Sequence, residues 1–247
     1  MIFEGAGYVA MGSSFAAGPG IAPAADRRAG RSAANYPHLV AAALGLRLTD
    51  VTFSGATTAH LLDAPQRGRP PQIAAVRPDT RLVTVTAGGN DAGYIGSLIK
   101  AGALPGPFRR SARIPEAAAF DAVAASLARV VRAVRAHAPG ARVLLVDYLP
   151  VLDPATSGAD GLPLTPEQAR RARAAAAALT SAFRRAAGEG AEFVEVADAA
   201  RGHGHRSPAP WTTGFARSWP FRGAVPYHPT GAGMEALAAL VVDRLAA

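Results

Sequence analysis

A serine stands at the end of a short apolar run near the amino terminus. Residues Tyr8 to Met11 are hydrophobic, and Gly12 separates them from Ser13 and Ser14. The run is typical of a buried strand in a parallel sheet, and the glycine indicates a sharp turn at its carboxyl end. Ligands of open α/β sheets bind beyond the carboxyl ends of the strands, which favours Ser14 as a nucleophile. On local evidence alone, an ordinary turn or helix cap explains the Ser-Ser pair better than a catalytic role does.

A serine hydroxyl is a poor nucleophile at neutral pH unless a base takes its proton. The chain has six histidines. His38, His60 and His137 fall on or near predicted helices and are interpreted as structural or surface residues. His228 is followed by Pro229 and the start of the last predicted helix, so a rigid element holds the loop that carries it. His228 is therefore the best candidate for the base.

Metal and cofactor chemistry find little support in the sequence. His203 and His205 form a His-x-His pair in a glycine-rich loop, but no third ligand stands at a recognisable spacing. The chain has no cysteine, which excludes disulfides and cysteine-based metal or redox chemistry. We predict that the protein needs neither a metal nor a cofactor.

Four short blocks resemble, in the same order, those of a known enzyme family. Residues 12–18 are similar to a Gly-Asp-Ser-x-x-x-Gly nucleophile block, Gly55 follows a predicted strand, residues 88–91 read Gly-Gly-Asn-Asp, and residues 225–229 read Val-Pro-Tyr-His-Pro. Each block is short, but the ordered set spans nearly the whole chain and resembles the SGNH, or GDSL, hydrolases. The resemblance implies a serine esterase or lipase on a flavodoxin-like α/β/α sandwich.

The resemblance also implies roles for single residues. Ser14 becomes the nucleophile and His228 the base, while the backbone N–H groups of Ser14 and Gly55 and the side-chain amide of Asn90 form an oxyanion hole. Without the resemblance, Gly55 is as well explained by a tight turn, and Asn90 by the N-cap of the following helix.

Two residues depart from the family pattern. Ser13 stands where the family has an aspartate beside the nucleophile, and Val225 stands where it has the acid of the catalytic triad. Because valine cannot orient an imidazole through its side chain, we expect a Ser-His dyad in which a backbone carbonyl near Val225 accepts the imidazole N–H. In the alternative, Asp198 or, less readily, Asp91 reaches His228 from another loop.

Strands alternate with helices along the chain, which indicates a parallel sheet covered on both faces. The predicted strands are residues 8–11, 48–53, 81–87, 142–149 and 192–196. The first main predicted helix follows an N-cap at Asn35 and carries the apolar run 39–46, and the others are residues 115–137, 166–187 and 230–246. Residues 18–34 lack periodicity and are predicted to form a loop. We therefore expect one domain over residues 1–247, a three-layer sandwich around a five-stranded parallel sheet.

The formal net charge is +8, and Lys100 is the only lysine among 26 basic residues. Such a charge can attract nucleic acid, but the arginines are scattered, no nucleic-acid-binding motif is present, and GC-rich codon usage explains the composition. No run reaches the roughly 18 apolar residues of a membrane span. The segment before the first strand is too short for a signal peptide, although a trimmed secreted protein would look the same. The sequence is compatible with a cytoplasmic protein and with a secreted one whose signal peptide has been removed.

The expected substrate is a short- or medium-chain carboxylic ester, with no nucleic-acid partner and no integral membrane association. Residues 201–227 include Trp211, Phe215, Trp219 and Phe221, which either line an acyl or alcohol pocket or anchor the loop. The alternatives with the same site are a carbohydrate O-deacetylase, a thioesterase or a lysophospholipase. A binding protein on this fold that has lost activity is a further alternative.

Overall fold

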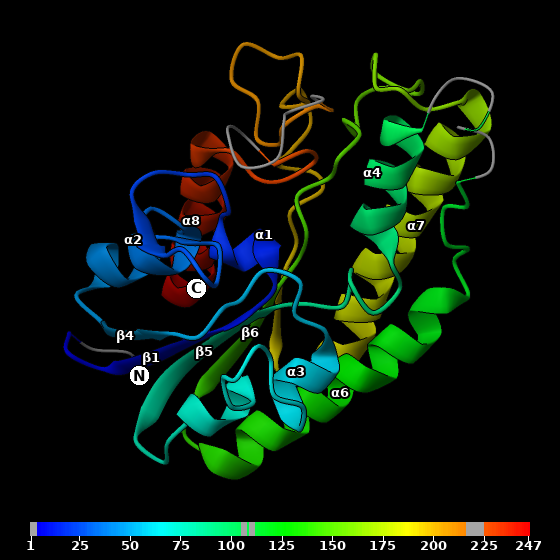
Figure 1. Ribbon diagram of the computed structural model, residues 1–247. Coiled ribbons are helices and arrows are strands. Elements are labelled where there is room, and N and C mark those ends of the chain that lie inside the picture. The colour runs from blue at the N-terminus through cyan, green and yellow to red at the C-terminus, as the bar shows by residue number, and fades with distance from the viewer. Residues whose placement is uncertain (1–3, 105–107, 109–111, 216–224) are drawn as a thin grey trace.

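Five parallel strands form the central sheet of the computed structural model, which describes residues 4–104, 108, 112–215 and 225–247 (Figure 1). The strands are β1 (Gly7–Gly12), β4 (Arg47–Asp50), β5 (Thr80–Thr86), β6 (Arg142–Val146) and β7 (Glu192–Val194). Their order is β4-β1-β5-β6-β7, and each neighbouring pair is parallel. This is the doubly wound, flavodoxin-like order, so the predicted fold class is confirmed.

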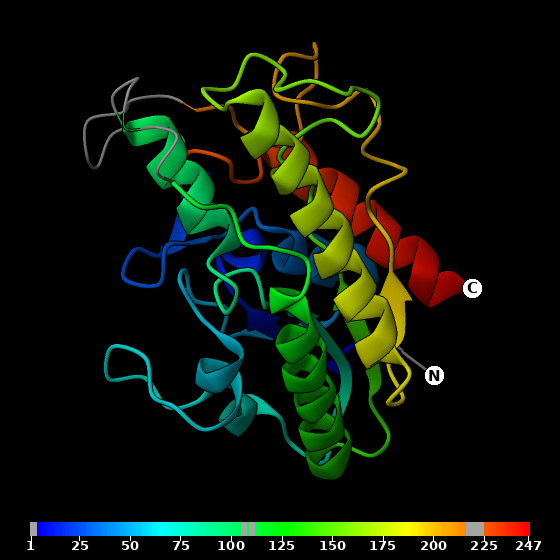
Figure 2. The same cartoon turned by 90° about the vertical axis from the view of Figure 1, so that its right-hand side faces the viewer.

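Helices cover both faces of the sheet. On one face α2 (Tyr36–Leu44) packs against α8 (Gly231–Ala246), and on the other α6 (Ala119–His137) packs against α7 (Pro166–Ala187), as Figures 1 and 2 show. The remaining helices are α1 (Ser14–Ala17), α3 (Thr58–Leu62), the 3₁₀ helix η1 (Gln72–Ala75) and α4 (Tyr94–Ala103). Helix α6 buries the apolar stripe that its sequence spacing predicts, made of Val123, Leu127, Val130, Val131 and Val134.

The structure corrects several predicted boundaries. The segment 18–34 is not only a loop, because β2 (Ala24–Asp26) and β3 (Arg31–Ser32) form a short antiparallel ribbon. These strands are too short to show an alternating pattern. Strands β4 and β6 end three residues earlier than predicted, and α6 begins at Ala119 rather than at Pro115. The boundaries of α7 match the prediction, and the capping box of Thr165 and Gln168, with Pro166 as the first helical residue, marks its start.

Gly12 sets the turn that follows β1. Its φ is +150°, and a Cβ at this position would lie 2.5 Å from the carbonyl oxygen of Thr86 at the end of β5. The next residue, Ser13, donates its backbone N–H to that same carbonyl at 2.8 Å. A glycine is needed here because the turn passes in contact with the backbone of β5. The carboxyl ends of β1 and β5 thus lie together.

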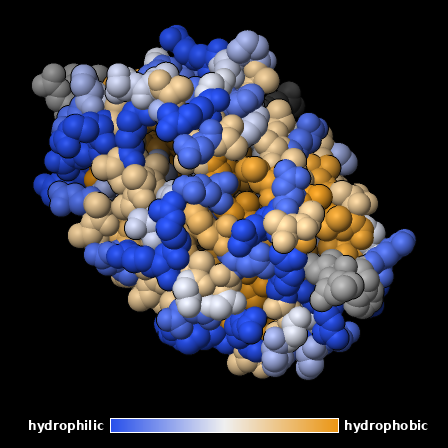
Figure 3. Space-filling view, turned by 180° about the vertical axis from the view of Figure 1, so that it is seen from behind, coloured by the Kyte–Doolittle hydropathy of each residue, from blue (hydrophilic) through white to orange (hydrophobic). Residues whose placement is uncertain are grey.

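The surface seen from behind mixes hydrophilic residues with a smaller, broken area of hydrophobic ones (Figure 3). Among the described residues, Phe108 is the one large hydrophobic side chain that is mostly exposed, at 64%. Within the same residues, no helix is long and apolar enough to cross a membrane.

Candidate active site

Ser14 and His228 meet beyond the carboxyl end of β1, although 214 positions separate them in the sequence. The Oγ of Ser14 lies 2.8 Å from Nε2 of His228. Ser14 is the first residue of α1 and follows the β1 turn directly, whereas His228 lies in the loop before α8. Both side chains are largely buried, since Ser14 is 8% and His228 6% exposed. The structure thus brings the expected nucleophile and base into hydrogen-bond contact.

The other ring nitrogen of His228, Nδ1, lies 2.8 Å from the carbonyl oxygen of Pro226. A carbonyl can only accept, so Nδ1 carries the proton and Nε2 is free to accept from the hydroxyl of Ser14. The partner of Nδ1 is thus the carbonyl of Pro226 and not that of Val225, which accepts from the hydroxyl of Thr213 at 2.6 Å. Tyr227, between Pro226 and His228, has a φ of +62°, a turn geometry that the sequence did not indicate.

Neither of the two aspartates considered as a triad acid contacts His228. Asp198 is exposed and accepts from Arg201 at 3.2 Å. The carboxylate of Asp91 accepts the backbone N–H and the hydroxyl of Thr58 at the start of α3. In the described part of the chain, the nitrogens of the His228 ring contact Ser14 and Pro226 and no carboxylate.

Burial lowers the pKa of His228 below its ordinary value of 6.5, and the hydrogen bond to the Pro226 carbonyl partly opposes this effect. Burial acts in this direction because a charged imidazolium loses its hydration. The neutral imidazole therefore predominates at neutral pH, and this is the form that can take a proton from Ser14.

The expected oxyanion donors lie on three turns beyond the sheet. No described residue accepts the backbone N–H of Ser14 or of Gly55, so both are available to a ligand. Gly55 has a φ of +81°, which favours glycine. The amide of Asn90 donates to the carbonyl of Ala56 at 2.8 Å, which uses one of its two hydrogens. Asn90 is not the cap of α4, because Gly93 takes that position.

Comparison with known proteins decides the family. Residues 10–236 match the GDSL-like lipase/acylhydrolase family. The chain belongs to this family. It is 36% identical to Lipase 2 of Streptomyces coelicolor over 96% of this chain and 85% of that protein. The predicted enzyme class, an ester hydrolase of the GDSL or SGNH type, is thereby confirmed.

Two solved structures have similar folds. An extracellular lipase from Streptomyces rimosus superposes with a TM-score of 0.78 at 28% identity, covering 96% of this chain and 99% of that one. A phospholipase A1 from Streptomyces albidoflavus gives a TM-score of 0.76 at 27% identity, covering 97% and 99%. Both similarities cover nearly the whole of each chain, as expected for a GDSL-like acylhydrolase.

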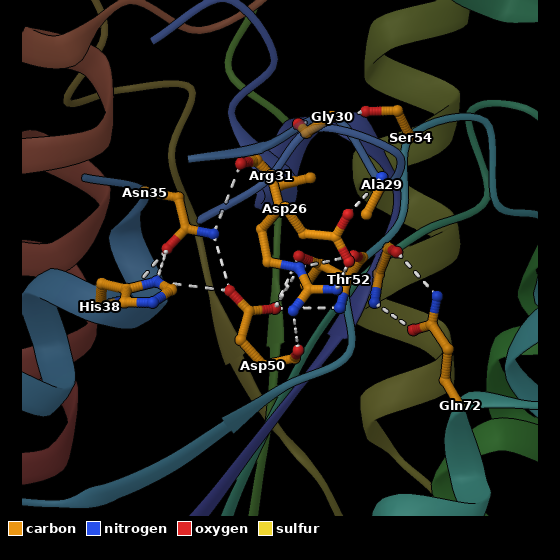
Figure 4. Close-up of polar contacts among 12 residues, drawn as sticks. Asp26, Ala29, Gly30, Arg31, Asn35, His38, Asp50, Thr52, Ser54 and Gln72 are labelled. Carbon is orange, nitrogen blue, oxygen red and sulfur yellow. Dashed lines mark hydrogen bonds and ion pairs between the residues drawn. The ribbon is translucent and has the colours of Figure 1, made fainter. Parts of the chain in front are cut away.

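Gln72 supports the turn before Ser14, the candidate nucleophile of this acylhydrolase, a contact that the sequence did not reveal. Its Oε1 accepts the N–H of Gly12 at 2.7 Å, and its Nε2 donates to the carbonyl of Gly12 at 3.1 Å (Figure 4). Gln72 is 6% exposed and lies on η1, within a proline-rich connection. The only signal in the sequence is a polar residue in that connection, which by itself predicts nothing about a contact 60 positions away.

A polar cluster around Asp50 supports the Gly55 turn (Figure 4). The Asp50 carboxylate accepts from the Asn35 amide at 2.8 Å and from the Thr52 hydroxyl at 2.7 Å. Arg31 donates to the Thr52 carbonyl at 3.1 Å. These bonds join the ribbon of β2 and β3 and the start of α2 to the segment between β4 and Gly55. The Asp50 cluster is therefore structural support for one of the candidate oxyanion donors.

Within the described residues, His203, Trp211 and Phe215 pack against other rings. His203 stacks on Trp211, with ring centroids 4.2 Å apart. The Phe215 ring lies 5.8 Å from that of Tyr227, beside His228 in the sequence. Among the described residues, no group of three or more His, Cys, Asp or Glu side chains could hold a metal ion. Trp219 and Phe221 lie outside the described residues.

Proposed function

We propose that this acylhydrolase cleaves carboxylic esters through an acyl-enzyme on Ser14, with His228 as its general base and no side-chain acid. The observation that carries the proposal is the alignment of Ser14 Oγ, the two His228 nitrogens and the Pro226 carbonyl, in two hydrogen bonds of 2.8 Å each. Membership of a lipase/acylhydrolase family supports the same reaction.

In the first half of the reaction, Ser14 Oγ attacks the ester carbonyl carbon while its proton passes to Nε2 of His228. The Nδ1–H group, held by Pro226, keeps the ring in place as it becomes charged. The oxyanion accepts from the N–H groups of Ser14 and Gly55 and from the free amide hydrogen of Asn90. His228 then returns the proton to the leaving alcohol, and the acyl group stays on Ser14.

In the second half, water replaces the alcohol. His228 takes a proton from the water, the resulting nucleophile attacks the acyl-enzyme, and the same donors hold the second oxyanion. Collapse releases the carboxylic acid and returns the proton to Ser14. A carbonyl partner orients His228 as an aspartate would, but it adds no negative charge, which agrees with the lowered pKa of the imidazole.

The substrates proposed are lipid esters with short or medium acyl chains. Similarity to streptomycete lipases supports a lipid ester, and the structural similarity to a phospholipase A1 favours phospholipids as a second candidate class. A panel of p-nitrophenyl esters of graded acyl length, extended by a diacylphospholipid, separates the two classes.

The decisive experiment compares the parent with Ser14→Ala on this panel. We expect hydrolysis to fall by about 10⁴-fold or more, as when a serine hydrolase loses its nucleophile. A fluorophosphonate should label the parent and leave the variant unlabelled. Hydrolysis retained by Ser14→Ala would refute the proposal, and a parent that neither hydrolyses nor reacts would indicate a binding protein instead.

The absence of a side-chain acid has its own test. Asp198→Asn should leave kcat within about twofold, since an exposed ion pair with Arg201 contributes little. If the variant keeps its fold and loses orders of magnitude in kcat, Asp198 is the acid and the dyad is wrong.

A further inference from the structure

The hydroxyl of Tyr148 lies between the nucleophile turn and the Asn90 turn. Its oxygen lies 3.0 Å from Oγ of Ser13 and accepts the backbone N–H of Gly89 at 3.2 Å. Tyr148 follows β6 by two positions and is 7% exposed. Because it accepts from Gly89 through one lone pair, its own hydrogen is free to be donated to Ser13. Both residues can therefore be bound at the same time.

The tyrosine ring is fixed by its neighbours on both sides. It packs on Phe15 with centroids 4.5 Å apart and meets Phe183 edge-on at 6.0 Å. Phe15 in turn lies 5.3 Å from the ring of His228. A Cβ on Gly89 would come within 2.9 Å of the Tyr148 ring, so the backbone at Gly89 packs directly against this ring. Tyr148 thus contacts the Ser13 turn and the Gly89 turn directly, and it reaches the ring of His228 through Phe15.

The two residues joined by Tyr148 each precede a candidate oxyanion donor. Ser13 comes directly before Ser14, whose backbone N–H is one donor, and Gly89 comes directly before Asn90, whose amide is another. We propose that Tyr148 is a positioning residue that sets the distance between these two donors by bridging Ser13 and Gly89. The inference rests on the proposed function, since it assigns Tyr148 to the oxyanion hole of that reaction.

The chemistry of the bridge suits this role. Burial raises the pKa of Tyr148 to about 12, so the phenol stays protonated over the range in which an esterase works. Ser13, the serine that replaces the family's aspartate, therefore has a neutral hydroxyl partner. A neutral bridge adds no charge near the developing oxyanion, so its effect is geometric.

The test measures kcat and KM for Tyr148→Phe, Ser13→Ala and the double variant. We expect each single change to lower kcat by about 10- to 100-fold with KM within about twofold, because displaced donors stabilise the transition state less. The double variant should be no slower than the slower single variant, since both changes break one bridge. The acid limb of the pH profile should stay in place, because His228 keeps its own contacts.

Tyr8→Phe is the matched control. Tyr8 is fully buried, and its hydroxyl forms a similar bond with the Thr84 hydroxyl at 2.8 Å, inside the sheet and away from the site. Tyr8→Phe should lower the melting temperature by about as much as Tyr148→Phe does, since each loses one buried hydroxyl, and it should leave kcat unchanged.

The inference fails if Tyr148→Phe keeps the kcat of Tyr8→Phe, or if the effects of Tyr148→Phe and Ser13→Ala multiply. If Tyr148→Phe does not fold, the kcat of Ser13→Ala tests the same bridge with a smaller change in side chain. Failure of the proposed function is recognised separately, by hydrolysis that survives Ser14→Ala or by a parent without activity.

Discussion

The candidate nucleophile and the candidate base are held by different kinds of structure. The turn before Ser14 lies at the end of an inner strand, and it is bonded to Gln72 and Tyr148, which are 60 and 135 positions away in the chain. The loop of His228 is held by its own neighbours, with Pro226 two positions away and Thr213 fifteen. The turn before Ser14 is therefore bonded to distant parts of the chain, whereas the backbone and Nδ1 hydrogen bonds of His228 lie within its own loop and only its ring reaches distant residues, Ser14 and Phe15.

The largest expected effect is that of His228→Ala. We expect kcat to fall by about 10⁴-fold or more, because Ser14 then has no base. The fold should persist, since the backbone N–H and carbonyl of His228 keep their hydrogen bonds to Thr213 without the imidazole. Circular dichroism and the ester panel test both parts, and a variant that keeps a tenth of the parent's kcat would exclude His228 as the base.

Gln72→Leu tests the serine side. It leaves the buried N–H of Gly12 without an acceptor, whereas the Gly12 carbonyl still accepts from Phe53 at 3.0 Å. We expect a loss of about 1–3 kcal/mol in the free energy of unfolding. The melting temperature should fall by about 2–10 °C, and kcat should fall with it. An unchanged melting temperature would contradict the dependence of this turn on distant elements.

Thr213→Val tests the histidine side. The Thr213 hydroxyl accepts the backbone N–H of His228 at 3.0 Å and donates to Val225. We expect kcat to fall by about tenfold for the loss of the two hydrogen bonds of this hydroxyl. The melting temperature should fall by about 1–6 °C, because the His228 N–H keeps the Val225 carbonyl as an acceptor at 3.4 Å. Thr213→Ser keeps the hydroxyl and should restore kcat. A large thermal effect would show that this loop is as integral to the fold as the nucleophile turn.

The smallest effect is a shift in pH dependence. Protonated His228 cannot accept from Ser14, so activity is present above its pKa and is lost as the pH falls through it. Since burial lowers that pKa, the acid limb of kcat/KM should have its midpoint below 6.5. Stability should also decline as the pH falls below about 6.5, because the unfolded chain binds this proton more readily. A midpoint above 6.5 would mean that a negative charge lies near the ring.

Much of this arrangement could be predicted from local patterns. Strand and helix alternation predicted the sheet, and the capping box at Thr165 marked the start of α7. Gly55 and Asn90 as site residues came from the resemblance of the ordered blocks to the SGNH hydrolases, which also supported Ser14 and His228. The structure places these four residues on turns beyond the sheet.

What could not be predicted depends on tertiary contacts. Gln72 and Tyr148 are polar residues whose partners lie far away in the sequence, so no spacing rule reveals them. The choice of the Pro226 carbonyl over that of Val225 depends on the left-handed turn at Tyr227, which is not a glycine. The ribbon of β2 and β3 was missed because its strands have three and two residues.

The long separation between Ser14 and His228 also has a consequence for biosynthesis. The ribosome makes the serine early and the histidine 214 positions later, which takes roughly 10 to 40 seconds at usual rates of synthesis. During that time the strand, turn and oxyanion donors can form, but the serine has no base. Helix α8, which follows the histidine, must then pack against α2. In the proposed mechanism, hydrolytic activity is therefore acquired only after the last helix has packed, and its appearance reports that both ends of the chain have come together.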